Sequence, residues 1–344
     1  MRICIKNHAF RKLFFDSAEV WLVKKRLVLF LILLSLITPH ASADFIRWVD
    51  FTVGYPALRQ ALELDIASQG EEKPLNWIDI LALAATRTGG SGIHVKSVLA
   101  AADELRGDRA PQEFLGEQYK YFAYYRQAYQ AVLGGLVGSY AIQVTDKTTG
   151  QVQWVAAYGL KAFSPIASGY GYSHYADFGN RRSYGFARRH LGNDLIGALG
   201  TPIVAVESGR VEALGWNQYG GWRIGIRSDD NLRYYYYAHL QKDHPYVDGL
   251  AEGQHVQAGD VIGFMGRTGY STHENVNNIE TVHLHFGIEL VFDESQKECD
   301  SEIWIDPYAI VELLSSHTSS VRYDRENNKW ERVYPYRDLD RETL

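Results

Sequence analysis

The sequence predicts an α+β protein in which a small N-terminal helical domain precedes an antiparallel β domain. Between residues 44 and 139, apolar side chains recur every three to four positions, which is the period of amphipathic helices. After Gly138 the period falls to two, and glycine, asparagine and aspartate separate short apolar runs. That pattern is typical of antiparallel strands and their turns. With 344 residues, 46% of them hydrophobic, the chain is long enough for two modest domains.

The first 43 residues have the parts of a secretory signal peptide. An apolar run at 27–37 follows the basic stretch 24–26 and precedes a small-x-small motif that ends at Ala43. The run is shorter than the roughly 20 residues that span a membrane. The basic region before it is unusually long, so a translation start near Val23 and retention as an uncleaved anchor both stay open. In either case we expect the remainder outside the cytoplasmic membrane, secreted or in the cell envelope.

Four helices are expected in the domain 44–139, at 55–66, 76–90, 95–105 and 111–138. In the first, Leu58, Leu62 and Ile66 are spaced by four. The second starts at Asn76, a residue that caps helices well, and stops at two glycines. The last carries an apolar stripe formed by Leu115, Tyr119, Phe122, Tyr125, Tyr129, Val132, Leu133 and Leu136. Such a stripe is typical of a helix packed on a core, so the role of this domain stays open.

The β domain is expected to cover residues 140–318. It begins with a hairpin at 140–160 and continues with an aperiodic segment at 163–190, whose length favours a functional loop. Short strands follow from Thr201, and a helix at 306–316 closes the domain. Residues 319–344 are expected to form a charged, loosely ordered C-terminal tail.

Charge and cysteine content exclude some classes of function. The formal net charge is −6, so no basic field favours nucleic-acid binding. The chain has two cysteines, Cys4 in the leader and Cys299 in an acidic loop. A cleaved product therefore keeps one thiol and has no internal disulfide. We interpret Cys299 as a surface thiol.

Five residues have side chains suited to metal binding or acid–base chemistry. His190 and Asp194 lie four apart between glycines, which favour a loop or a strand end. His283 and His285 lie two apart in an alternating run, so both side chains point to one face of a strand. His239 follows a tyrosine-rich run and, counted with a period of two, shares a face with the tyrosines at 235 and 237. Two imidazoles and a carboxylate would make a three-ligand catalytic zinc site.

The order of these motifs resembles that of the lysostaphin-type (LytM-type) zinc endopeptidases. The resemblance covers residues 190–290 and rests on an H-x-G-x-D signature followed by four further motifs. In order these read "HLGND", "GTPIVAVESGRVEALG", "YYAHL", "VQAGDVIGFMGRTGYS" and "HLHF". It implies a compact antiparallel sheet with a groove on one face. It also implies Zn²⁺ as cofactor, with His190, Asp194 and His285 as ligands and His239 and His283 as catalytic residues. The sequence does not say which of these two is the base; His283 is our first choice.

Two segments depart from the family pattern. The insertion 272–282 before the last motif is longer than usual, and His273 within it is a candidate for the rim of the groove. The aperiodic segment before His190 lies outside the family signature. By position it could wall the groove, and the residues in it that we expect to meet substrate are Tyr170, Tyr172, Tyr184, Arg181 and Arg182.

The resemblance implies an exported zinc endopeptidase that cuts amide bonds in peptidoglycan cross-links or stems, with peptidoglycan peptides as partners. One alternative is a non-catalytic envelope protein that binds cell wall or activates another hydrolase. Another is a zinc protease that acts on secreted proteins. The bond that is cut and the oligomeric state do not follow from the sequence. Membrane retention through the N-terminal segment stays possible.

Overall fold

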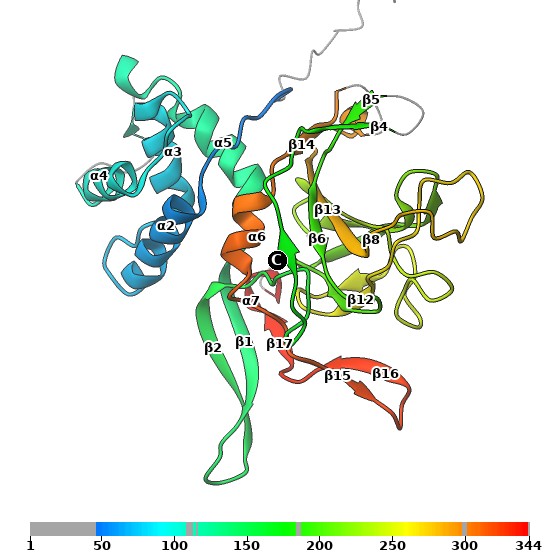
Figure 1. The fold of residues 1–344 in the computed structure, drawn as a ribbon. Coiled ribbons are helices and arrows are strands. Elements are labelled where there is room, and N and C mark those ends of the chain that lie inside the picture. The colour runs from blue at the N-terminus through cyan, green and yellow to red at the C-terminus, as the bar shows by residue number, and fades with distance from the viewer. Residues whose placement is uncertain (1–45, 108–112, 115, 184–186, 298–300, 343–344) are drawn as a thin grey trace, which may run out of the picture. The chain divides into compact units, whose positions relative to one another are not determined.

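The computed structural model describes residues 46–107, 113–114, 116–183, 187–297 and 301–342, which lie in the compact unit Ile46–Leu344 (Figure 1). The leader at 1–43, Leu115, Tyr184 and Cys299 lie outside the described residues. Within the described part, no helix has both the length and the apolar composition needed to cross a membrane.

Four of the helices lie in the N-terminal part of the described chain. They are α2 (Tyr55–Ser68), α3 (Trp77–Thr88), α4 (Val95–Leu105) and α5 (Phe122–Leu133). Asn76 caps α3 as predicted, because its side chain accepts hydrogen bonds from the N–H groups of Ile78 and Asp79 over 2.9 and 3.3 Å. Gly89 ends this helix with a φ of 71°, a left-handed conformation that glycine adopts readily. The first three predicted helices are confirmed.

The fourth helix is shorter than predicted. A 3₁₀ turn, η2 (Glu117–Tyr119), precedes α5, and Gly116 before it has a φ of 101°, which no α-helix contains. Most of the predicted stripe is nevertheless buried: Tyr119, Phe122, Tyr129, Val132, Leu133 and Leu136 all lie in the core. On α2 the stripe prediction fails at one position, since the side chain of Ile66 is 38% exposed.

The central sheet has eight strands, and all its pairs are antiparallel, as predicted. Its spatial order is β11-β8-β9-β10-β13-β6-β3, and β14 pairs with β13. The strands are β3 (Ser173–His174), β6 (Asn193–Ile196), β8 (Gly209–Asn217), β9 (Gly221–Ser228), β10 (Arg233–Ala238), β11 (His255–Val256), β13 (His283–Leu290) and β14 (Ile303–Ile305). Two small two-stranded sheets join β7 (Pro202–Val204) to β12 (Val261–Phe264) and β4 (Arg181–Ser183) to β5 (Ala187–Arg189).

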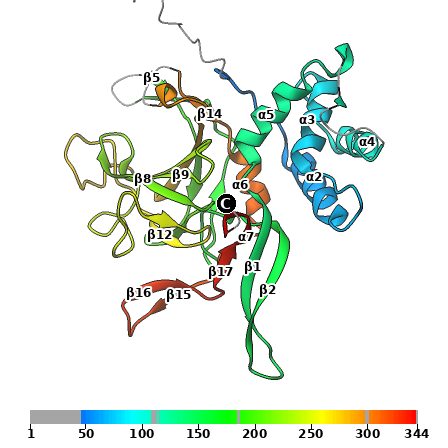
Figure 2. The same cartoon turned by 180° about the vertical axis from the view of Figure 1, so that it is seen from behind.

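The hairpin predicted at 140–160 is present as β1 (Val137–Thr145) and β2 (Val152–Leu160). In both views it projects away from the central sheet, as does the hairpin of β15 (Val321–Asp324) and β16 (Lys329–Arg332) (Figure 1, Figure 2). The predicted boundary between the two domains, at residues 139 and 140, falls inside β1. The division into two domains stays a prediction.

The C-terminal segment is not the loosely ordered tail that its composition predicted. It forms β15, β16, β17 (Tyr336–Asp338) and the short helix α7 (Leu339–Glu342), and β17 pairs with β1. Lys161, which is buried, lies 3.0 Å from the carboxylate of Asp338 and 2.9 Å from that of Asp340. These ion pairs attach a segment whose charged composition suggested solvent exposure.

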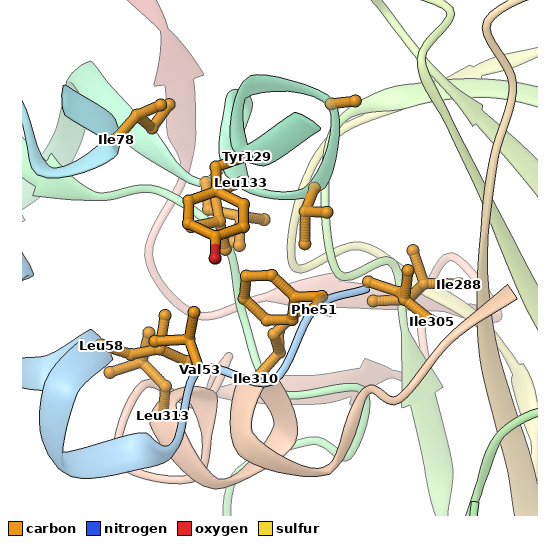
Figure 3. Close-up of a cluster of buried hydrophobic side chains, with 14 of the residues drawn as sticks. Phe51, Val53, Leu58, Ile78, Tyr129, Leu133, Ile288, Ile305, Ile310 and Leu313 are labelled. Carbon is orange, nitrogen blue, oxygen red and sulfur yellow. The ribbon is translucent and has the colours of Figure 1, made fainter. Parts of the chain in front are cut away.

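Helices and sheet share one hydrophobic core. Figure 3 shows side chains from the segment before α2, from α2, α3 and α5 and from the sheet converging on helix α6 (Tyr308–Leu314). The labelled residues include Phe51, Leu58, Tyr129, Leu133, Ile288, Ile305 and Ile310. α6 begins later than predicted, although the side chain of Asp306 accepts a hydrogen bond from the N–H of Tyr308 over 2.9 Å.

Candidate metal centre and active site

The neighbouring strands β6 and β13 bring the candidate metal ligands together. Their register sets Asp194 opposite His285, while His190 lies just before β6. Asp194 Oδ1 lies 2.9 Å from His190 Nε2 and 3.1 Å from His285 Nδ1. The two ring nitrogens are 2.9 Å apart. These three residues form a group whose ligand atoms all lie within 4.8 Å of one another.

The donor set fits a zinc ion. Two imidazole nitrogens and one carboxylate oxygen are ligands that zinc prefers, and three protein ligands are the usual number in a catalytic site. Tetrahedral ligands held about 2.0–2.2 Å from the metal lie roughly 3.3 Å from one another. The observed spacings of 2.9 to 3.1 Å are close to that value. Burial opposes charge on Asp194, but hydrogen bonds from His190 and His285 hold the pKa of its carboxyl well below the usual range.

Asp177 orients the first imidazole. His190 Nδ1 lies 3.3 Å from both the carbonyl oxygen and the carboxylate Oδ1 of Asp177. A ligating histidine commonly gives its second ring N–H to such a group, which fixes the ring and its tautomer. Sequence reasoning missed Asp177, because nothing in the aperiodic segment distinguishes it from an ordinary loop aspartate.

The glycine of the H-x-G-x-D signature has a steric role. A Cβ added to Gly192 would lie 2.7 Å from Cε1 and Nε2 of His285 and 2.6 Å from the carbonyl oxygen of Phe286. Any larger residue would push the second imidazole away from Asp194. The close approach of β6 to β13 therefore requires glycine here.

Two further imidazoles lie beside the candidate metal centre. The rings of His239 and His283 have centroids 4.7 Å apart, and His283 Nε2 is 3.8 Å from Asp194 Oδ1. His239 Nδ1 lies 2.9 Å from the carbonyl oxygen of Thr268, and His283 Nδ1 lies 2.9 Å from that of Thr281. Burial lowers the pKa of His239 well below its usual range, and the neighbouring imidazoles add to this effect.

The strand prediction for His239 is wrong in one respect. β10 ends at Ala238, and His239 has a φ of 63°, so the alternation of faces stops before it. Tyr235 and Tyr237 point into the core, whereas His239 turns toward His283. A non-glycine residue in this left-handed conformation is uncommon, and such residues cluster at functional sites.

These four histidines and Asp194 line a cavity of about 70 Å³. Its other walls include Arg182, Arg188, Tyr219, Tyr236 and Tyr270. Of the predicted groove residues, Arg182 reaches this cavity and donates a hydrogen bond to Asp194 Oδ2 over 3.1 Å. Sequence reasoning missed the other four. Tyr236 could have been found, because it alternates with the buried Tyr235 and Tyr237 in the predicted strand.

The remaining groove predictions do not reach the cavity. Tyr170 is 41% exposed, Tyr172 packs against the hydrophobic core, and Arg181 is exposed on β4. His273 is exposed in a turn of the insertion. None of these four residues lines the cavity, and the fifth predicted groove residue, Tyr184, lies outside the described residues.

An antiparallel sheet with two imidazoles and a carboxylate at one cavity, flanked by two further imidazoles, is the arrangement of a metallopeptidase catalytic domain. Residues 188–298 match the model of peptidase family M23.

Relatives of known activity are similar over this region. The chain is 40% identical over 117 residues to the L-Ala--D-Glu endopeptidase of Bacillus subtilis. The aligned region covers 34% of this chain and 34% of that protein. It is 39% identical over 98 residues to lysostaphin of Staphylococcus simulans, covering 28% of this chain and 17% of that protein. Peptidoglycan DD-endopeptidase ShyC of Vibrio cholerae is 32% identical over 114 residues, which cover 32% of this chain and 23% of that protein. The chain thus spans about a third or less of the length of these relatives.

Two solved structures are also similar. A LytM protein from Ruminococcus gnavus matches with a TM-score of 0.47 and 23% identity, covering 78% of this chain and 94% of that one. The catalytic domain of lysostaphin from Staphylococcus simulans matches with a TM-score of 0.32 and 31% identity, covering 41% and 92%.

Proposed function

We propose that this protein is an exported, zinc-dependent endopeptidase that hydrolyses amide bonds in the peptides of peptidoglycan. The observation that carries the proposal is the convergence of His190, Asp194 and His285 within 4.8 Å beside the two imidazoles of His239 and His283. The M23 match over residues 188–298 and the similar peptidoglycan endopeptidases support the substrate class. Export rests on the sequence of residues 1–43.

In this proposal His190 Nε2, His285 Nδ1 and the carboxylate of Asp194 hold the zinc ion. When bound, zinc supplies a Lewis acid that polarises the peptide carbonyl and makes water more acidic. Asp177 keeps His190 in the tautomer whose Nε2 carries a lone pair.

The two flanking histidines move the protons. Each gives its Nδ1–H to a backbone carbonyl, so its Nε2 is left for water or substrate. A neutral ring can take a proton from water and pass it to the leaving amine. A protonated ring can donate a hydrogen bond to the carbonyl oxygen as negative charge develops there, a contribution worth about 3 kcal/mol in comparable sites. Hydrolysis needs one ring in each state.

Digestion of purified sacculi tests the proposal. We expect the wild-type protein to bind about one zinc per chain, to release soluble muropeptides, and to lose this activity in a chelator. His285→Ala should lose both the zinc and the activity. His273→Ala is the matched control, because His273 is an exposed histidine that does not line the cavity.

Mass spectrometry of the released fragments identifies the bond that is cut. Release of muropeptides by His285→Ala at the wild-type rate would rule out the mechanism. Unchanged sacculus binding without any release would support the non-catalytic alternative. Cleavage of casein but not of sacculi would support a protease of secreted proteins.

A further inference from the structure

A second, larger cavity adjoins the candidate active site. It has a volume of about 790 Å³ and shares His285, Tyr236, Tyr219 and Arg188 with the smaller cavity. A space of this size is large enough for several atoms of a ligand beyond the reacting bond. It therefore lies where a bound peptide could continue from the metal centre.

Strand register defines one wall of this cavity. His283, His285, Gly287 and Glu289 alternate along β13, so their side-chain positions share one face of the sheet. On β10, Tyr236 pairs with Gly287 and Tyr234 pairs with Glu289. Glu289 is four residues from His285, which is about 13 Å along an extended strand.

Between these two points, the absence of a side chain at Gly287 leaves room for the indole of Trp304. A Cβ at this position would lie 2.7 Å from the ring of Trp304 and 3.0 Å from the carbonyl oxygen of Leu191. The indole of Trp304 therefore rests against the backbone, with its Nε1 donating to Glu302 Oε2 over 2.7 Å. The wall between the metal centre and Glu289 is thus backbone and aromatic surface.

Glu289 is a buried carboxylate without a partner. Its residue is 4% exposed, it lines the larger cavity, and its Oε1 is buried without a hydrogen bond. No described residue forms a hydrogen bond or an ion pair with it. Burial, helped by the nearby Glu302, raises the pKa of Glu289 to about 7. Buried polar groups in proteins are nearly always paired, so this exception needs an explanation.

The basic residues Arg188, Arg189, Arg223 and Lys297 line the cavity, and the two cations that act on Glu289, Arg227 and Lys297, are paired with other groups. Arg227 Nε donates to Glu212 Oε2 over 2.8 Å, and its Nη1 donates to the carbonyl oxygen of Asn231 over 3.1 Å. Lys297 also binds the carboxylate of Glu212. Both basic residues also approach the carboxylate of Glu294, at 3.8 Å for Arg227 and 3.5 Å for Lys297. Their ion pairs are thus with Glu212 and Glu294, and neither forms one with Glu289.

We infer that the Glu289 end of this cavity is a substrate subsite for a primary ammonium group, carried by the side chain of a diamino acid in the peptide. This inference deepens the proposed function and rests on it. An ammonium group supplies the three donors and the positive charge that the buried carboxylate lacks. The subsite would favour stems whose diamino acid is not cross-linked, because acylation of the amine in a cross-link removes its charge.

The distance fits a short peptide. An extended chain spans about 3.3–3.6 Å per residue, so four residues cover the distance from His285 to Glu289. Fewer residues suffice when the amine lies at the end of a long side chain such as that of lysine.

Binding of two peptides that differ only in the amine tests the subsite. The probes are L-Ala-D-Glu-L-Lys-D-Ala and the same peptide with an acetylated lysine. Calorimetry uses the full chain carrying His283→Ala, so that turnover is slow on the time scale of the titration. We expect the free-amine peptide to bind at least tenfold more tightly, and Glu289→Gln in this background to remove the preference. Glu63→Gln, which changes an exposed carboxylate on α2, should keep it.

Hydrolysis of the same pair by the wild-type chain separates the two proposals. Hydrolysis of both peptides with equal kcat/KM would overturn the subsite and leave the proposed function standing. Tighter binding of the free-amine peptide, together with no release of muropeptides from sacculi by the wild-type chain, would overturn the function and leave the subsite. A preference that persists in Glu289→Gln would also overturn the subsite. The wild-type comparison needs no variant, so it holds even if Glu289→Gln fails to fold.

Discussion

His239 and Thr268 are joined by a hydrogen bond in which His239 Nδ1 lies 2.9 Å from the carbonyl oxygen of Thr268. Since a carbonyl oxygen only accepts, the ring must carry its proton on Nδ1 and present Nε2 to the cavity. His283 repeats the arrangement with the carbonyl oxygen of Thr281. Two backbone carbonyls thus fix the tautomers of both flanking rings.

Loss of either flanking ring should lower kcat by about 10²- to 10⁴-fold, because general acid–base and oxyanion contributions are of that size. We expect His239→Gln and His283→Gln to retain zinc, since neither side chain belongs to the three-ligand group. The pH dependence of kcat separates their roles: the variant without the base loses the acidic limb, and the variant without the donor loses the alkaline limb. Loss of the same limb in both variants would contradict this division.

Asp177 should control zinc affinity without touching the metal. The backbone carbonyl of Asp177 accepts the hydrogen bond from His190 Nδ1, and its carboxylate Oδ1 lies 3.3 Å from the same nitrogen. Asp177→Asn keeps the carbonyl but removes the negative charge beside the ligand ring and the ion pair with Arg182, so it weakens the support of the ring. We expect zinc affinity to fall about 10- to 100-fold, as for other groups that orient metal ligands. Competition with a colorimetric chelator measures it. Asp103→Asn, an exposed aspartate on α4, is the control. Equal affinities for Asp177→Asn and wild type would contradict the orienting role.

Arg233 should be the most sensitive charged residue for stability. It is fully buried, with Nε 2.8 Å from Glu207 Oε2 and Nη1 2.8 Å from the carbonyl oxygen of Ala131 at the end of α5. Arg233→Ala leaves the buried Glu207 without its cation, so we expect a loss of about 3–5 kcal/mol in the free energy of unfolding. Urea denaturation measures it. Arg59→Ala, which removes an exposed ion pair on α2, should cost less than about 1 kcal/mol. Similar losses in both variants would contradict the role of burial.

The elements that the sequence predicted well are those with a strong local signal. The cap at Asn76, the alternation of β13 and the β1–β2 hairpin each depend on residues close in sequence. The shared face of His283 and His285 followed from strand periodicity alone. Their meeting with His190 and Asp194 was expected only through the family resemblance, because it depends on the pairing of β6 with β13.

The features that the sequence did not predict depend on contacts between distant segments. Charge made the C-terminal segment look solvent-exposed, but its aspartates pair with Lys161 more than 170 residues away. His239 does not share the strand face because its own backbone is in the left-handed conformation, which no hydropathy pattern encodes. Arg188 and Tyr270 reach the cavity from separate segments and contact each other there, a meeting that only the fold produces.

The buried Glu289 predicts an unusual dependence of stability on pH. Its pKa is about 7 in the folded chain and 4.5 when unperturbed, so the folded state binds its proton more tightly. The groups that set this value, besides burial, are Glu302 and Glu212, which raise it, and Arg227 and Lys297, which lower it. The contribution of Glu289 to the free energy of unfolding is fully present below pH 4.5. It is lost as the pH rises through 7, because the folded chain must then bury the charged carboxylate.

Glu289→Gln keeps the shape of the protonated side chain and has no charge to bury. We therefore expect the variant to match the wild type near pH 4.5 and to become more stable above pH 7, by up to about 3 kcal/mol. Urea denaturation of the ligand-free chain at pH 5 and pH 8 measures the difference. Glu63→Gln should show no such trend, because Glu63 is exposed. A stability difference that is the same at both pH values would mean that Glu289 does not change its protonation on folding, and the carboxylate would then have a partner in solution.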